Sequence, residues 1–294
     1  MSPTARSLVA LLPAICLTSI ASAQTRWWKV YGGQNDEIGY SVQQTTDSGY
    51  VTAGYTWSYG AGGRDLYLIK SNAQGDTIWT RTYGGALDDY GTAAQQTADG
   101  GYVIAGYTWS YGAGGADAYL VKADADGDTL WTRTYGGRDF DGGYAVRQTT
   151  DGGFVVAGST NCVGAGSCDA YLIKTNAQGD TLWTRTYGGP NADKAYAVRQ
   201  TSDGGYVIAG FAGSFGAGNC DVYLIKSDAN GSVGVAEEGR EPQAPSRGPA
   251  ATVVRRLLPG AVAFDVTGRR VLTPRSGILF VRDQSAVTKV LLRR

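Results

Sequence analysis

The residues of this sequence best suited to chemistry are aromatic side chains in glycine-rich loops that lie close to carboxylates. Trp57 and Trp109 each open a loop of the form Trp-Ser-Tyr-Gly-Ala-Gly-Gly. Aromatic rings can stack on the apolar faces of sugars, while carboxylates accept hydrogen bonds from sugar hydroxyls. The candidate ligand-binding residues are Trp57, Tyr59, Trp109, Tyr111, Phe211 and Phe215. The alternative is that these rings only pack between neighbouring repeats.

Carboxylate pairs near these loops could in principle act as an acid and a base, as they do in glycoside hydrolases. Asp88 with Asp89 and Asp139 with Asp141 are such pairs, but the carboxylates differ from repeat to repeat, which favours solvated loop charges. The chain contains no histidine, which excludes Ser-His-Asp and Cys-His catalysis. We therefore expect no enzymatic activity.

Metal and cofactor signatures are also weak. The run Asp124-Ala-Asp126-Gly-Asp128 resembles part of a calcium loop, but its glycine stands fourth rather than sixth. The equivalent run at Asn72 reads Asn-Ala-Gln-Gly, so we interpret both as hairpin turns. No glycine-rich phosphate loop leads into a helix, and the cysteine spacing fits no zinc pattern. We expect neither a metal nor a cofactor.

The elements that must position these loops belong to a repeat. The run Thr-Leu-Trp-Thr-Arg-Thr-Tyr-Gly-Gly recurs so that Trp27, Trp79, Trp131 and Trp183 stand 52 residues apart without insertion. Each unit contains two runs rich in β-branched and aromatic residues around an Asp-Gly-Gly or Asp-Ser-Gly turn, which predicts a β-hairpin. A second hairpin follows the aromatic loop. Each unit should therefore form four antiparallel strands.

The segment Tyr-Leu-Ile-Lys is apolar on both strand faces, which indicates that both faces of its sheet are covered by neighbouring repeats. Four-stranded units of this length that stack face to face are typical of β-propeller blades. We expect an all-β fold, a four-bladed β-propeller over 24–233. An open β-solenoid of the same repeats is the alternative.

The ends of the repeat array suggest how such a ring would close. The array begins with a surplus Trp segment at Trp27 and stops after Lys226 without another one. If the first segment completes the last blade, no sheet edge stays open. This closure predicts that Lys29 contacts Asp221, just as Asp65 is expected to pair with Arg81 across two strands of one hairpin.

The two ends of the chain indicate export. Residues 1–23 combine Arg6, an apolar run and Ala21-Ser22-Ala23, the features of a secretory signal peptide rather than a membrane anchor. Residues 234–258 form a linker rich in proline and glycine, and 259–294 a small β-module. Residues 251–294 hold 9 Lys and Arg against 2 Asp and Glu. An exported chain rarely meets nucleic acid, so we do not expect it as a partner.

An exported protein can form disulfides, and three cysteines follow the signal segment. Cys162 and Cys168 bracket a short glycine-rich loop, which makes them the first candidates for a disulfide. Cys168 and Cys220 occupy equivalent places in successive repeats and are the competing pair. One cysteine must stay unpaired within the monomer.

The C-terminal runs Gly-Arg-Arg-Val at 268–271, Ser-Gly-Ile-Leu-Phe-Val-Arg at 276–282 and Lys289-Val290 resemble the type A sorting domain of the bacterial type IX secretion system. The resemblance implies an export address that the secretion machinery recognises. The usual opening Asn-Pro-Phe-rich strand of that domain is absent here. The matching sorting-motif residues are Gly268, Arg269, Gly277, Val281, Arg282 and Lys289.

The repeat, with Asp-Gly-Gly-Tyr-Val-Ile-Ala-Gly-Tyr-Thr and Leu-Trp-Thr-Arg-Thr-Tyr-Gly-Gly, is similar to a β-propeller-like repeat of many secreted proteins from bacteria that use such tails. The sequence thus predicts a non-catalytic binding or interaction scaffold, outside a bacterium or on its outer surface, exported by Sec and then by type IX secretion. A glycan-binding or glycan-hydrolysing propeller is the alternative. The expected partners are the export machinery and a glycan or surface protein.

Overall fold

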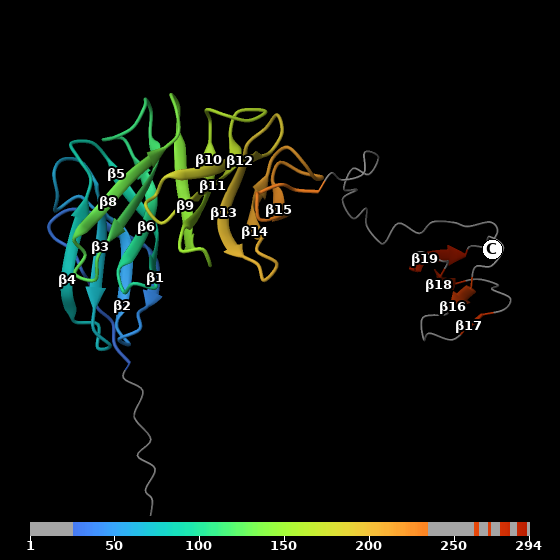
Figure 1. Cartoon of the computed structure of the whole chain (residues 1–294), viewed down its shortest axis with the longest axis horizontal. Coiled ribbons are helices and arrows are strands. Elements are labelled where there is room, and N and C mark those ends of the chain that lie inside the picture. The colour runs from blue at the N-terminus through green and yellow to red at the C-terminus, as the bar shows by residue number, and fades with distance from the viewer. Residues whose placement is uncertain (1–25, 235–261, 265–269, 272–276, 283–286, 293–294) are drawn as a thin grey trace, which may run out of the picture.

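The computed structural model describes residues 26–234 and four short strands between 262 and 292. Residues 26–234 contain fifteen antiparallel strands in four sheets, one per repeat (Figure 1). The strands, sheet by sheet, are β1 (Glu37–Gln44), β2 (Tyr50–Thr56), β3 (Asp65–Ser71) and β4 (Thr77–Tyr83); β5 (Asp89–Gln96), β6 (Tyr102–Thr108), β7 (Asp117–Ala123) and β8 (Thr129–Tyr135); β9 (Asp141–Gln148), β10 (Phe154–Thr160), β11 (Asp169–Thr175) and β12 (Thr181–Tyr187); β13 (Asp193–Gln200), β14 (Tyr206–Ala212) and β15 (Asp221–Ser227). The expected all-β repeat of antiparallel hairpins is confirmed.

The turn between the first two strands of each repeat forms as its sequence predicts. Asp99 Oδ1 accepts the Gly101 amide at 3.1 Å and also contacts the Thr97 hydroxyl, which closes the turn with side-chain oxygens. Gly100 has φ +85°, a conformation that favours glycine because it has no Cβ. The aspartate and the glycine together set the register of the hairpin.

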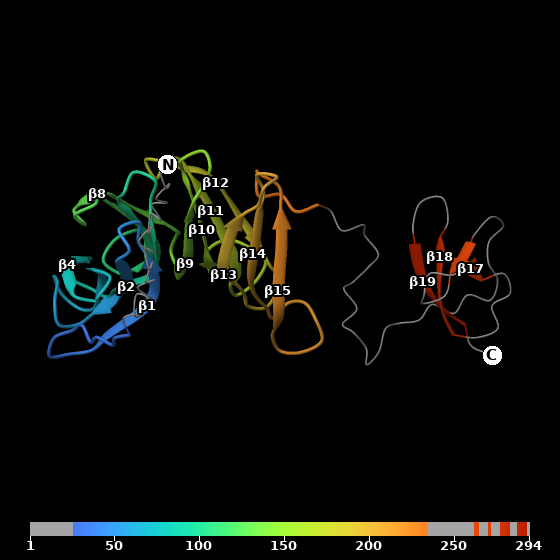
Figure 2. The same ribbon diagram turned by 90° about the horizontal axis from the view of Figure 1, so that it is seen from below.

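Successive sheets pack face to face. Leu66 and Leu68 of β3 are fully buried against Tyr102 and Ile104 of the next repeat, and the other two interfaces repeat the pattern. All seven residues of β3, β7 and β11 are buried, which confirms that the Tyr-Leu-Ile-Lys strands are covered on both faces. The sheets thus form one continuous array, with β4 at one end and β15 at the other (Figure 2).

The N-terminal Trp segment lies on the first repeat and does not complete the last one. Trp27 packs edge-on against Tyr50 with ring centroids 5.6 Å apart. Lys29 Nζ is 2.8 Å from Asp76 Oδ1, and the Tyr31 hydroxyl donates to Gly75 O at 2.7 Å. The expected contact of Lys29 with Asp221 is therefore replaced by a contact with Asp76.

The same contacts recur inside the array, which explains this placement. Trp79 packs on Tyr102 as Trp27 packs on Tyr50, because each Trp segment lies across the second strand and the second hairpin turn of the following repeat. The last sheet has the order β13-β14-β15 and contains three strands. Within residues 26–234 the array is open, and closure of the ring by residues 27–31 of the same chain is not observed.

The charge pairs expected within one hairpin instead link neighbouring repeats. Arg81 Nε is 3.0 Å from Asp128 Oδ1 of the next repeat, and Arg133 reaches Asp180 in the same way. The expected pairing of Asp65 with Arg81 was wrong, because Asp65 is buried and accepts the Ala61 amide at 3.0 Å. Burial raises the pKa of Asp65 above its usual range.

The C-terminal strands form an antiparallel sheet of order β17-β16-β18-β19. Its members are β16 (Val262–Phe264), β17 (Arg270–Val271), β18 (Gly277–Arg282) and β19 (Val287–Leu292). Gly277, Val281 and Arg282 belong to β18 and Lys289 to β19, whereas Gly268 and Arg269 lie outside the described residues. The expected signal peptide lies outside them as well. No helix in the described parts of the chain is long and apolar enough to span a membrane.

Candidate functional site

The aromatic loops are held in place by contacts within the fold. Trp57 is half exposed, with the Arg64 guanidinium 5.0 Å from its ring centroid, and Arg64 forms an ion pair with Asp88 at 3.0 Å. Trp109 packs within 6.0 Å of the rings of Tyr90 and Phe140. These tryptophans retain an exposed face, but neither belongs to the groove described below.

The other predicted aromatic residues brace the loops. The Tyr59 hydroxyl donates to Gly32 O and the Tyr111 hydroxyl to Gly84 O, at 3.0 and 2.7 Å. Phe215 occupies the corresponding position in the last repeat and packs on Tyr223. Phe211 instead corresponds to the β2 residue Tyr55, so the structure does not gather the six residues around one cavity.

The carboxylates beside these loops fasten them to the sheets. Asp89 Oδ2 accepts hydrogen bonds from the Gly85 amide and the Ser110 hydroxyl, at 2.8 and 2.7 Å. Its other oxygen, Oδ1, is buried and has no hydrogen-bond partner among the described residues. Asp88 is in the ion pair with Arg64. This geometry assigns Asp88 and Asp89 to loop anchoring.

The three described cysteines have free thiols. Cys162 Sγ donates to Asp141 Oδ2 at 3.0 Å, where Ser110 makes the equivalent contact with Asp89 one repeat earlier. Burial, reinforced by Asp141, raises the pKa of Cys162. Cys168 is buried and Cys220 exposed. The structure thus does not contain the expected disulfide between Cys162 and Cys168.

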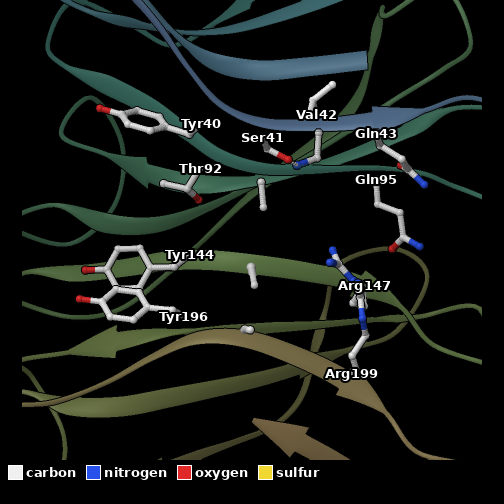
Figure 3. Close-up of a pocket in the computed structure, with 14 residues that line it drawn as sticks. Tyr40, Ser41, Val42, Gln43, Thr92, Gln95, Tyr144, Arg147, Tyr196 and Arg199 are labelled. Atoms are coloured by element: carbon white, nitrogen blue, oxygen red, sulfur yellow. Dashed lines mark hydrogen bonds between the residues drawn. The ribbon is translucent and has the colours of Figure 1, made fainter. Parts of the chain in front are cut away.

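A cavity lies where the first strands of the four repeats converge. Strands β1, β5, β9 and β13 run side by side and enclose a groove of about 310 Å³ (Figure 3). One end of the groove carries hydroxyl-bearing side chains and the other carries amides and guanidinium groups. At matching positions of the four repeats these are Tyr40, Thr92, Tyr144 and Tyr196 at one end and Gln43, Gln95, Arg147 and Arg199 at the other.

A β-bulge in each first strand presents the hydroxyl-bearing residues. In β1 the register passes from Gly39 directly to Ser41, so Tyr40 has no partner on β2. Thr92, Tyr144 and Tyr196 are skipped in the same way. A bulge adds an unpaired residue and re-aims its side chain, and bulges are common beside functional sites. The repeated bulge therefore turns one side chain per repeat into the groove.

The tyrosine end is partly ordered by hydrogen bonds. The Tyr144 hydroxyl lies 3.0 Å from Ser159 Oγ, and the Tyr144 and Tyr196 rings are 5.4 Å apart. The Thr92 hydroxyl donates to Gly143 O at 2.7 Å. Burial raises the pKa of both Tyr40 and Tyr144, so both phenols stay protonated at neutral pH.

The other end of the groove is positively charged. Gln43 and Gln95 accept the amides of Gln96 and Gln148, each at 2.8 Å, and so link neighbouring repeats. Arg147 and Arg199 take the corresponding positions in the last two repeats, and within residues 26–234 neither forms an ion pair. Arg147 Nε is buried without a hydrogen-bond partner there. The arrangement can accept an anionic group.

This groove is not among the sites predicted from the sequence. A signal was present, because Tyr40, Tyr144 and Tyr196 recur at the repeat spacing and so do Arg147 and Arg199. The bulge could not be read from the pattern, since one extra residue reverses the face of every residue after it. The sequence instead directed attention to the loops, where aromatic residues are densest.

Comparison with known proteins identifies no family. No family model matches the chain. The regulatory protein FlaEY of Caulobacter vibrioides is 28% identical over 216 residues, which cover 65% of this chain and 22% of FlaEY. The chain therefore spans about a fifth of the length of the curated relative it matches.

Proposed function

We propose that this protein is a non-catalytic binding scaffold that acts outside a bacterial cell, and that the groove between its first strands is the ligand site. The observation that carries this proposal is the pair Arg147 and Arg199, which face a groove with tyrosine rings at its other end and have no carboxylate partner among residues 26–234. Guanidinium groups bind carboxylates and phosphates in a bidentate manner.

The chemistry of the groove favours an acidic oligosaccharide. Tyrosine rings offer apolar faces for a sugar ring and hydroxyls for hydrogen bonds, while the arginines would bind a sugar carboxylate. A groove of about 310 Å³ is at the small end of ligand sites, which suits one or two sugar units. FlaEY is named a regulatory protein. A role in binding or regulation does not require the histidine of a catalytic triad, and this chain contains no histidine.

The export route and the propeller geometry belong to the same proposal. The sequence of 1–23 and the resemblance of the C-terminal runs to a sorting domain support export by Sec and then by type IX secretion; of the matching residues, Gly277, Val281 and Arg282 belong to β18 and Lys289 to β19. The convergence of β1, β5, β9 and β13 on one groove supports an arc of a β-propeller, because the innermost strands of propeller blades surround a central channel.

The groove is tested by substitutions that other repeats already carry. Arg147→Gln with Arg199→Gln installs the glutamine of the first two repeats, and each lost charged hydrogen bond is worth about 1.5–3 kcal/mol. By isothermal titration calorimetry we expect binding of a polygalacturonate oligosaccharide to weaken at least about tenfold, since 1.4 kcal/mol is a factor of ten. A neutral oligomer such as dextran should bind the protein and the variant equally weakly.

The loop site and the enzyme alternative are separated by two further variants. Trp57→Ala with Trp109→Ala leaves the groove intact, so binding to polygalacturonate should persist. If that variant loses binding while the glutamine variant retains it, the ligand site lies on the loops and the groove proposal is wrong. Hydrolysis of the oligosaccharide that disappears on Asp88→Asn with Asp89→Asn would overturn the non-catalytic assignment.

A further inference from the structure

The last sheet of the array presents an apolar face that is buried in every other repeat. Leu224 of β15 is 69% exposed and Val222 is 88% exposed. The residues at the position of Leu224 in the earlier repeats, Leu68, Leu120 and Leu172, are all 0% exposed because the next sheet covers them. The face of β15 has the composition of an internal interface and lacks its covering sheet among residues 26–234.

The first sheet presents the complementary face at the opposite end. Val42 of β1 is 69% exposed, whereas the equivalent Val146 and Val198 are buried against the preceding sheet. A hollow of about 120 Å³ lies beside it and is lined by Tyr31, Gly39, Thr52, Tyr67 and Ile69 among others.

The next interface shows what such a hollow receives. There Leu66 of the first repeat lies so close to Gly91 that a Cβ on this glycine would be 2.7 Å from Leu66 Cγ. Gly91 corresponds to Gly39, and Leu66 corresponds to Val222 of the last repeat. The open hollow at Gly39 is thus the counterpart of a site that a side chain of the preceding repeat fills inside the array.

The backbones of the two ends are complementary as well. The sheet β13-β14-β15 has three strands, so β15 leaves one edge unpaired. Among the described residues the segment 27–31 has no neighbouring strand, and the side chains of Trp28 and Val30 are exposed. The pairing of β11 with β12 places Leu172 opposite Arg185. The same register places Leu224 opposite Lys29 of another chain.

From these four features we infer that a second copy of this chain docks its first repeat onto the last repeat of the first copy. The segment 27–31 of the second copy becomes the fourth strand beside β15, and Val222 enters the hollow at Gly39. Because the contact is head-to-tail, the complex keeps one free β1 face and one free β15 face. Further copies can therefore add until the curvature of the array closes a ring. The bound strand also removes the open sheet edge of β15.

A hydrogen bond at each internal interface supports the same geometry. The side-chain carbonyls of Gln96, Gln148 and Gln200 accept amides from the turn of the preceding repeat, at 2.8–2.9 Å. Gln44 occupies this position in the first repeat, and Ser202 occupies the donor position in the last. Head-to-tail docking brings Gln44 of one copy to the Ser202 amide of another.

The inference is tested by size-exclusion chromatography with light scattering on the chain that begins at Gln24. We expect a dimer or larger closed assembly within about 1–100 µM, since interfaces of ordinary size bind in the micromolar range or tighter. Leu224→Glu destroys the face on β15 and Val42→Glu destroys the face on β1, so each variant alone should be monomeric. Both residues are exposed, and circular dichroism should show an unchanged fold.

Mixing the two variants distinguishes a head-to-tail contact from a symmetric one. Each retains one intact face of opposite kind, so an equimolar mixture should form a one-to-one complex. Leu182→Glu, which adds the same charge at a half-exposed position of β12 away from both end faces, should assemble like the unmodified chain. A monomer over the whole range, or variants that stay monomeric when mixed, would overturn the inference. If the β15 face is protected from hydrogen exchange in such a monomer, another segment of the same chain covers that face, and the inference is wrong.

Discussion

The turn lysines provide a stability test in which one repeat serves as the control for another. Lys174 Nζ lies 2.8 Å from Asp151 Oδ2 in the third repeat, and Lys226 Nζ lies 2.8 Å from Asp203 Oδ2 in the fourth. The side chain of Lys174 is only 4% exposed, whereas that of Lys226 is 47% exposed because no further sheet covers β15. The two pairs have the same chemistry and differ mainly in the burial of the lysine.

Asp151→Asn should destabilise the protein clearly, and Asp203→Asn should have little effect. In Asp151→Asn, the buried ammonium of Lys174 keeps only its hydrogen bond to Thr175 O, at 2.8 Å. A hydrogen bond between charged groups contributes about 1.5–3 kcal/mol to the free energy of unfolding. Because Asp151 is half exposed and solvent screens its charge, we expect a loss near the lower end, about 1–2 kcal/mol. For a protein of this size that corresponds to a Tm lower by about 2–8 °C. In the second variant, water replaces the carboxylate at Lys226.

The pH dependence of this difference has a definite sign. Burial opposes the effect, but hydrogen bonds from Lys174, Thr149 and the Gly153 amide lower the pKa of Asp151 to about 2. An unfolded aspartate titrates near 3.9, so the contribution is complete above about pH 5 and is lost as the pH falls towards 2. Differential scanning fluorimetry from pH 2 to pH 7 should show the Tm of Asp151→Asn approaching that of the unmodified protein at low pH.

The control variant decides whether this reasoning holds. Measurements at low protein concentration keep β15 uncovered. If Asp203→Asn then lowers the Tm as much as Asp151→Asn, burial of the lysine does not determine the strength of the pair. A difference between the two variants that stays constant from pH 2 to pH 7 would show that the carboxylate charge is not responsible.

Two further predictions concern packing. Leu120→Ala should lower the free energy of unfolding by about 2–5 kcal/mol in urea titrations, because Leu120 is fully buried, whereas Leu224→Ala at low concentration should change it by less than about 0.5 kcal/mol. Equal losses would contradict the open end of the array. Gly158→Ala should prevent normal pairing of β9 with β10, because the new Cβ would clash with Gly142 O, and it should yield little folded protein by circular dichroism. A variant with unchanged stability would show that the two strands can separate at no cost.

The sequence alone determined the architecture of one repeat. The spacing of Trp27, Trp79, Trp131 and Trp183 defined its length, and the Asp-Gly-Gly turns defined its first hairpins. Turn chemistry and strand alternation act between residues that are close in the chain, so they are visible in a linear pattern. For the same reason the coverage of both faces of β3, β7 and β11 could be predicted from their apolar residues.

Only the tertiary structure decided how the repeats meet. Lys29 pairs with Asp76, and Arg81 with Asp128, because each Trp strand packs on the repeat that follows it. The groove depends on a bulge at Tyr40 and its counterparts, which changes which side chains face the centre. Such contacts depend on the rotation between neighbouring sheets, and no spacing along the chain encodes that rotation. The same packing leaves the faces of β1 and β15 exposed, because no further sheet covers either end of the array among residues 26–234.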